Sequence, residues 1–174
     1  MPVVRDARRA GIARARFGAI EIERKFLVPD PPEDLDRHPS TAIEQGYVAI
    51  ADDGTEVRIR RRDANATLTV KSGGGRSRVE EEIEIDPQRF ERLWPLTEGR
   101  RIEKTRYEIP AGDGLTIELD VYDGALAGLV VAEVEFGSER AADAFAVPDW
   151  MGREVTDDKR YKNQRLACDG VPPG

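Results

Sequence analysis

Cysteine, histidine and long apolar runs are scarce in this sequence of 174 residues. The one cysteine, Cys168, cannot form a disulfide within the chain, so a reducing compartment, the cytoplasm, is expected. No apolar stretch approaches the length of a membrane span, and no apolar core of a signal peptide is present. The formal net charge of −7 disfavours a nucleic-acid binder, which normally carries a positive surface. The lone histidine, His38, follows a proline-rich segment and is expected to be exposed.

Charge is the abundant feature. Charged residues make up 35% of the chain, well above the usual share of about a quarter. Aliphatic runs alternate with these charges, which favours a folded domain over disorder. The first 17 residues differ, because they hold five arginines and a single aspartate. We expect residues 1–18 to be a disordered basic extension, with a targeting or membrane-surface segment as the alternative, and residues 19–170 to form one domain.

Eight segments with period-two alternation predict β-strands, and residues typical of turns bound each of them. The segments are 19–28, 43–50, 55–62, 66–72, 78–86, 101–109, 115–122 and 129–136. Eight strands at this spacing are typical of a sandwich or a barrel. Helices are expected after Asp86-Pro87, after Ser138 and over about 156–167.

Charged side chains recur at every second position of these segments, so they share one face of each strand. Segment 19–28, for example, places Glu21, Glu23 and Lys25 together and Arg24 on the opposite face. A sheet with one face in water would explain any single strand. Across the set, however, acids and bases segregate by strand, whereas exposed faces normally mix the two signs.

A closed sheet would turn this charged face inward. Unpaired buried ions cost on the order of several kcal/mol each, so a dry interior is excluded. A hydrated interior that holds metal ions and a polyanion removes the conflict. Paired carboxylates suit Mg²⁺ or Mn²⁺, and clusters of Arg and Lys suit phosphate. The pattern therefore favours a metal–polyphosphate complex inside a barrel.

The segment Glu21-Ile22-Glu23-Arg24-Lys25 resembles the ExExK signature that opens the CYTH domain, or triphosphate tunnel metalloenzyme, family. Further segments resemble the family in order: Gln45-Gly46-Tyr47, Val57-Arg58-Ile59-Arg60, Leu68-Thr69-Val70-Lys71, Glu82-Ile83-Glu84, Glu103-Lys104-Thr105-Arg106-Tyr107, Glu118-Leu119-Asp120-Val121-Tyr122, Ala132-Glu133-Val134-Glu135 and Glu154 to Tyr161. The resemblance covers about residues 19–168 and looks closest to compact bacterial inorganic tripolyphosphatases. It implies an α+β, mainly β fold: an eight-stranded antiparallel closed β-barrel with a few flanking helices.

The resemblance also implies roles for the charged residues. Metal, Mg²⁺ or alternatively Mn²⁺, would be held by acids: Glu21, Glu23, Asp120, Glu133 and Glu135. Phosphates would be bound by bases: Lys25, Arg58, Arg60, Lys71, Lys104, Arg106 and, from the expected C-terminal helix, Lys159. Glu82 and Glu84 would be further tunnel acids. Lys25 and Lys104 are the catalytic candidates, and the sequence leaves open which of them contacts the attacking water.

The expected activity is metal-dependent hydrolysis of a terminal phosphoanhydride of a small-molecule triphosphate, above all inorganic tripolyphosphate. The alternatives are a thiamine triphosphatase, a nucleoside triphosphatase, a class IV-type adenylate cyclase and a non-catalytic polyphosphate- or nucleotide-binding module. The low aromatic content of 6% leaves little surface for stacking on a base, which favours an inorganic substrate. The complete set of acids argues against a pure binder. No nucleic-acid or membrane partner is expected, and a homodimer is left open.

Overall fold

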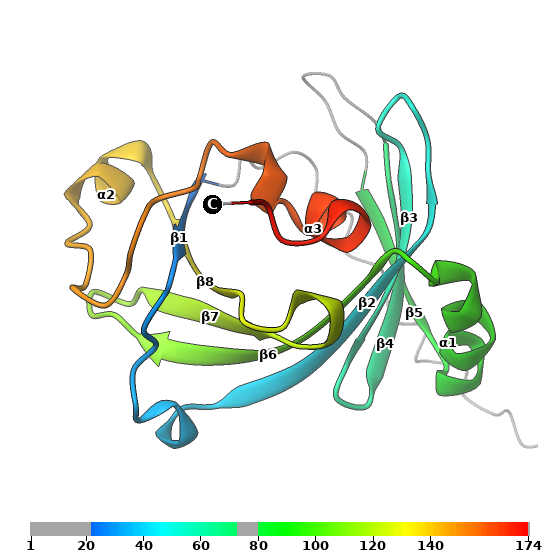
Figure 1. Ribbon diagram of the computed structural model, residues 1–174, viewed down its shortest axis with the longest axis horizontal. Coiled ribbons are helices and arrows are strands. Elements are labelled where there is room, and N and C mark those ends of the chain that lie inside the picture. Colours follow the sequence, from blue (N-terminus) through cyan, green and yellow to red (C-terminus); the bar gives the residue numbers. More distant parts are fainter. Residues whose placement is uncertain (1–21, 73–79, 174) are drawn as a thin grey trace, which may run out of the picture.

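The computed structural model describes residues 22–72 and 80–173. In this part of the chain eight β-strands form one antiparallel sheet, shown in Figure 1. The strands are β1 (Ile22–Leu27), β2 (Ser40–Ile50), β3 (Glu56–Arg62), β4 (Asn65–Lys71), β5 (Glu80–Ile85), β6 (Arg101–Pro110), β7 (Thr116–Tyr122) and β8 (Val130–Phe136). The eight predicted strands are confirmed, although the expected starts of the first and fifth lie outside the described residues.

The strand order is β1-β8-β7-β6-β2-β3-β4-β5, and every neighbouring pair is antiparallel. The sheet curves so strongly that the C-terminal segment lies inside the curve (Figure 1). Within residues 22–72 and 80–173, however, β1 and β5 at the two ends of the order share no hydrogen-bonded pairing. The free edge of β1 bonds a later segment instead, because Leu27 N donates to Arg153 O and Val155 N donates to Lys25 O. The mainly β, antiparallel expectation is confirmed, and the described sheet is not closed by hydrogen bonds.

Two helices begin where the sequence predicts them. The helix α1 (Pro87–Leu93) follows Asp86, whose carboxylate accepts the Arg89 N–H at 2.8 Å. The helix α2 (Glu139–Ala144) follows Ser138, whose hydroxyl oxygen accepts the Ala141 N–H at 3.2 Å. Each side-chain oxygen satisfies a backbone donor that the first turn of a helix leaves free. Figure 1 shows both helices outside the curve of the sheet.

The third predicted helix, over 156–167, is wrong in its first half. The chain forms the short 3₁₀ turn η4 (Lys159–Tyr161) and only then α3 (Asn163–Asp169). Asp158 holds the tight turn because its carboxylate accepts both the backbone N–H and the guanidinium of Arg160. Lys162 then adopts an extended conformation, which separates the turn from α3. The remaining 3₁₀ turns of the described residues are η1 (Leu35–Arg37), η2 (Trp94–Thr97) and η3 (Gly124–Leu126).

Three apolar clusters hold these elements together. Two lie on the convex face of the sheet: one under α2, around Phe26 and Leu119, and one under α1, around Ile59 and Phe90. The third lies on the concave face and packs α3 against the sheet; it includes Tyr47, Ile102, Tyr122, Val131, Tyr161 and Leu166. Burial of these apolar surfaces is the main favourable term in folding.

No helix among the described residues is long and apolar enough to cross a membrane.

Candidate functional site

The pairing register gathers the charged residues on the concave face, because directly opposed residues in a sheet point to the same side. One part of this face, which we call the paired half, lies on β1, β8, β7 and β6 and carries Glu23, Lys25, Glu133, Glu135, Glu118, Asp120, Lys104 and Arg106. The other part, the arginine half, lies on β3, β4 and β5 and carries Arg58, Arg60, Arg62, Lys71, Glu80, Glu82 and Glu84. Strand β2 joins the two halves, since it pairs with both β6 and β3.

Asp120 is the centre of the paired half and is fully buried. Its Oδ2 accepts from Lys104 Nζ at 2.5 Å and from Arg106 Nη2 at 2.7 Å, and its Oδ1 accepts from Arg106 Nε at 2.7 Å. Burial by itself raises the pKa of Asp120, but the two cations outweigh burial and hold that pKa below its ordinary value. Both oxygens of Asp120 therefore accept hydrogen bonds from cations in this structure.

The ion-pair network continues from Arg106 to β8 and β1. Arg106 also donates to Glu118 and, at 3.2 Å, to Glu133. Glu133 in turn pairs with the buried Lys25 at 2.6 Å. The Lys25 ammonium also lies 3.4 Å from the carbonyl oxygen of Tyr161 on η4. The predicted bases Lys25 and Arg106 are therefore brought together with acids of two strands, β7 and β8.

Lys104 occupies the most enclosed position of any basic residue in this network. It is 5% exposed, and its ammonium lies 5.1 Å from the centre of the Tyr122 ring. Burial lowers the pKa of Lys104 below its ordinary value, and Asp120 and Glu133 only partly oppose this shift. A buried lysine with a lowered pKa is a common element of catalytic sites.

Several acids of the paired half lie directly opposite one another on neighbouring strands. Glu23 lies opposite Glu135, and Glu118 lies opposite Glu133. Burial raises the pKa of Glu118, and the neighbouring acids Asp120, Glu133 and Glu135 raise it further against the effect of Arg106.

Opposed like charges destabilise a sheet, so a cation among these oxygens would relieve the repulsion. In residues 22–72 and 80–173 no three acidic, histidine or cysteine side chains already converge on one point. The carboxylate oxygens of these acids are nevertheless the type of ligand that a hard divalent cation prefers. The fifth predicted ligand, Glu21, lies outside the described residues.

Among the described residues, the cations of the arginine half form fewer ion pairs than those of the paired half. Arg58 is 7% exposed; its Nη2 donates to Thr69 Oγ1 at 3.3 Å and lies 3.9 Å from Glu82. Its Nε is buried without a hydrogen-bond partner in the described structure. Lys71 pairs with Glu80 at 3.1 Å near the end of the sheet.

Arg60 lies among other cations. Burial lowers its pKa to about 10, and Arg58, Arg62 and Arg106 contribute to the same shift. Its Nε donates to Gln45 Oε1 at 2.8 Å, and no carboxylate among the described residues forms an ion pair with it. Arg60 is therefore a half-buried cation whose charge no carboxylate among the described residues contacts directly.

Three predicted residues lie at the margins. Glu82 accepts from Thr69 Oγ1 at 2.9 Å, and Glu84 lies opposite Thr67 and is exposed. Lys159 is exposed on η4 rather than on a helix, and no contact recorded for the described chain joins it to either half.

The sequence reasoning missed the buried polar residues of β2. Gln45 and Tyr47 are 1% and 2% exposed, and they lie opposite Arg60 and Arg58. Their period-two spacing placed them on one face of a strand. Only the position of β2 in the sheet shows that this face meets the arginines.

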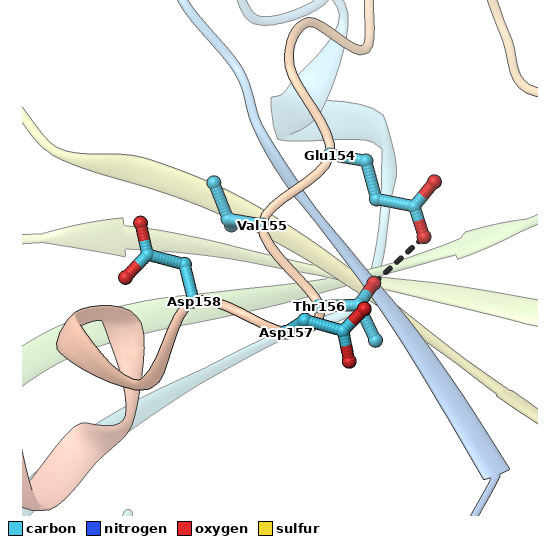
Figure 2. A pocket seen from close by; sticks show the side chains of 5 residues that line it. All are labelled: Glu154, Val155, Thr156, Asp157 and Asp158. Carbon is cyan, nitrogen blue, oxygen red and sulfur yellow. Dashed lines mark hydrogen bonds between the residues drawn. The ribbon is translucent and has the colours of Figure 1, made fainter.

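A hollow of about 520 Å³ along residues 154–158 is not a match for a phosphate site. Figure 2 shows its lining, in which the Thr156 hydroxyl donates to Glu154 at 2.7 Å. Glu154 also accepts two hydrogen bonds from Arg24, which packs over the Phe26 ring as part of the convex face. The lining is acidic and contains no basic side chain, and Arg24 lies away from the charged face as expected.

The CYTH domain matches residues 19–165. This chain belongs to the CYTH domain family. The motif resemblance is thereby confirmed over most of the chain.

Two relatives and a solved structure are closely similar to this chain. An inorganic triphosphatase of Nitrosomonas europaea is 53% identical over 147 residues, which cover 84% of this chain and 96% of the relative. An inorganic triphosphatase of Acetivibrio thermocellus is 42% identical over 149 residues and covers 84% and 92%. The crystal structure of an inorganic triphosphatase superposes with a TM-score of 0.74 at 47% identity, covering 90% of this chain and 99% of that one.

Proposed function

We propose that this chain is a metal-dependent triphosphatase that hydrolyses a terminal phosphoanhydride of inorganic tripolyphosphate. The observation that carries the proposal is the concave face, where carboxylates suited to a divalent cation face arginines and lysines suited to phosphate. Two relatives at 53% and 42% identity are named inorganic triphosphatases, which supports the same reaction here. The catalytic domain of this proposal is residues 19–170, preceded by an extension of residues 1–18.

The substrate would bind with its phosphates against the arginine half. Arg58 and Arg60 offer guanidinium groups that match phosphate oxygens in pairs, and Lys71 adds a point charge. A polyanion would supply the negative charge that the neighbours of Arg60 do not. We propose that the eight strands then surround the substrate as a closed barrel, with Lys159 approaching from η4.

A divalent cation, Mg²⁺ with Mn²⁺ as the alternative, would be held by the facing carboxylates. Metal dependence is general among CYTH triphosphatases. Glu23, Glu133, Glu135 and Asp120 are the described candidates, and Glu21 lies two residues before Glu23 in the sequence; Glu133 and Asp120 already contact cations of the protein. When bound, such a cation polarises phosphoryl oxygens and makes a coordinated water more acidic.

The chain's own groups would act on both ends of the reacting bond. A bond forms between the water oxygen and the terminal phosphorus while the bond to the leaving pyrophosphate oxygen breaks. Arg58 and Arg60 would hold the phosphates of the substrate and of the transition state alike, which lowers KM rather than raising kcat. Lys104 and Lys25, held by Asp120 and Glu133, orient the phosphoryl group and the attacking water.

A phosphate-release assay tests this proposal directly. We expect the purified protein to release phosphate from tripolyphosphate with Mg²⁺ and to lose this activity in EDTA. Glu135→Gln should lower the rate on the order of 100-fold, because it removes a charged oxygen from the facing acids. Glu81→Gln is the matched control, since Glu81 is an exposed acid on the other face of β5. Absence of phosphate release with either metal would refute the function, whereas a fully active Glu135 variant would refute only the metal assignment.

A substrate panel in the same assay separates the alternatives. We expect tripolyphosphate to be preferred over thiamine triphosphate and ATP, because Tyr47 and Tyr122 on the concave face are each only 2% exposed and present no ring for stacking. Formation of cyclic AMP from ATP would indicate the cyclase alternative. Tight binding of tripolyphosphate without turnover would indicate a binding module.

A further inference from the structure

A chain of hydrogen bonds leads from the interior of β2 to Arg60. The Gln45 Nε2 donates to the Tyr47 hydroxyl at 3.0 Å, and the Gln45 Oε1 accepts from Arg60 Nε at 2.8 Å. Gln45 is 1% exposed and Tyr47 is 2% exposed. The contact between Gln45 and Arg60 therefore lies at the base of the site, away from bulk solvent.

The chemistry of these groups determines how the amide is oriented. Burial raises the pKa of Tyr47 well above its ordinary value, so its hydroxyl stays neutral and accepts from the amide. The opposite orientation of Gln45 would place its NH₂ group against the Arg60 N–H, donor against donor. Gln45 is thus held with its oxygen toward the guanidinium.

Arg60 has a particular need for such a support. It is half-buried, and Arg58, Arg62 and Arg106 all repel it. Its Nε is bonded by Gln45, while its two terminal nitrogens form no hydrogen bond recorded in the described chain. A neutral oxygen fixes the position of the guanidinium without cancelling its charge, and the free terminal nitrogens form the fork that grips phosphate.

We infer that Gln45 is a positioning residue, which holds Arg60 charged and correctly oriented to bind a phosphate group of the triphosphate. This inference rests on the proposed function, and it deepens that function by explaining why a buried amide stands at this point. A carboxylate in the place of the amide would form an ion pair with Arg60 and compete with the substrate.

Three variants test the role of Gln45. Gln45→Glu should raise KM for tripolyphosphate about 10-fold or more, with kcat changed less than about threefold, because binding and not the reacting bond is affected. Gln45→Met keeps the approximate volume but removes the acceptor, and it should raise KM about 3- to 10-fold. The control Glu44→Gln alters the adjacent β2 residue, which pairs with Arg61 on the convex face, and should leave KM unchanged.

A double-mutant cycle separates positioning from a general structural effect. If Gln45 acts through Arg60, Gln45→Glu should raise KM less in an Arg60→Met background than in the native protein, because the competing ion pair is gone. An equal increase of KM in both backgrounds would overturn the inference. So would an unchanged KM for Gln45→Glu in the otherwise native protein, or a loss confined to kcat. Should the glutamate variant not fold, the same cycle with Gln45→Met decides the question.

The inference and the proposed function fail in different ways. Calorimetric titration with tripolyphosphate measures binding without turnover. If the native protein releases no phosphate, the function is refuted, but weaker binding by Gln45→Glu still supports the role of Gln45. If the native protein is active and Gln45→Glu binds and turns over normally, the function stands and the inference is refuted.

Discussion

The two halves of the concave face treat charge in opposite ways. In the paired half, Asp120 and Glu133 bind Lys104, Arg106 and Lys25 through short ion pairs that are almost entirely buried. In the arginine half, within residues 22–72 and 80–173, Arg58 lies 3.9 Å from the half-exposed Glu82 and Arg60 forms no ion pair. In the paired half each of these cations directly contacts a carboxylate, whereas Arg60 in the arginine half has no directly paired carboxylate among the described residues and is left for a ligand.

This difference separates stability from binding. Removing one partner from a buried ion pair strands the other charge and destabilises the fold. Removing one of several crowded cations relieves repulsion and instead weakens the attraction for an anion. Mutations of similar size should therefore act on the free energy of unfolding in the paired half and on KM in the arginine half.

The largest effect is expected for Asp120→Asn. It leaves Lys104 and Arg106 buried without their shared carboxylate, which should cost about 3–5 kcal/mol in the free energy of unfolding. Urea denaturation measures this change. The control Asp123→Asn, at an exposed position just after β7, should stay within about 0.5 kcal/mol of the native protein. An Asp120 variant with native stability would remove the basis for the comparison.

Arg60→Met should have the opposite profile. Without ligand its free energy of unfolding should fall much less than in Asp120→Asn, because the relief of repulsion among like charges offsets the loss of the hydrogen bond to Gln45. The KM for tripolyphosphate should rise about 10- to 100-fold. An increase of this size corresponds to the loss of a charge-assisted hydrogen bond between the enzyme and a phosphate group.

The matched control for this change is Arg61→Met. Arg61 pairs with Glu44 and Glu91 and lies over the Phe90 ring, so its loss should lower stability and leave KM unchanged. If the two arginine variants behaved alike, the distinction between the halves would be wrong.

Gly46→Ala should disturb the strand that joins the halves. A Cβ at Gly46 would lie 2.5 Å from the Thr97 Cβ, so η2 would have to move away from β2. We expect a loss of about 1–3 kcal/mol, as for other overpacked sites. The control Gly137→Ala should be close to neutral, since nothing lies within 4 Å of a Cβ there. Equal stability of the two variants would show that β2 tolerates movement of η2.

The smallest effect is expected for Glu154→Gln, on the convex side of the paired half. Hydrogen bonding from Arg24 lowers the pKa of Glu154, assisted by Thr156. The pair thus contributes stability above the unfolded-state pKa of a glutamate, and this contribution disappears as the pH falls through the lower folded-state pKa.

Because the Glu154 side chain is 40% exposed, we expect a difference of at most about 1 kcal/mol at neutral pH. Urea denaturation at neutral and acidic pH should show the difference between native and variant proteins shrinking on acidification. Glu33→Gln, in an exposed loop, should show no such trend. A difference that grew on acidification would contradict the sign of the pKa shift.

Local patterns were sufficient for the strands and their faces. Period-two alternation depends only on neighbouring residues, so Lys25, Arg58 and Asp120 could be assigned to the charged face before any pairing was known. The same holds for the helix starts at Asp86 and Ser138, where a side chain caps the backbone a few residues away. The helix expected over 156–167 was wrong because Asp158 favours a local turn over helix propagation.

The sequence by itself therefore determined which residues carry charge on a common face and which family the chain resembles. Tertiary structure decided which charges meet, because contacts between strands depend on sheet order and register. It placed β2 between β6 and β3, so that the neutral Gln45 reaches Arg60, and it gave both oxygens of Asp120 to Lys104 and Arg106. These long-range pairings turn a run of alternating charges into one half whose cations are directly paired and one half whose Arg60 is left for an anion.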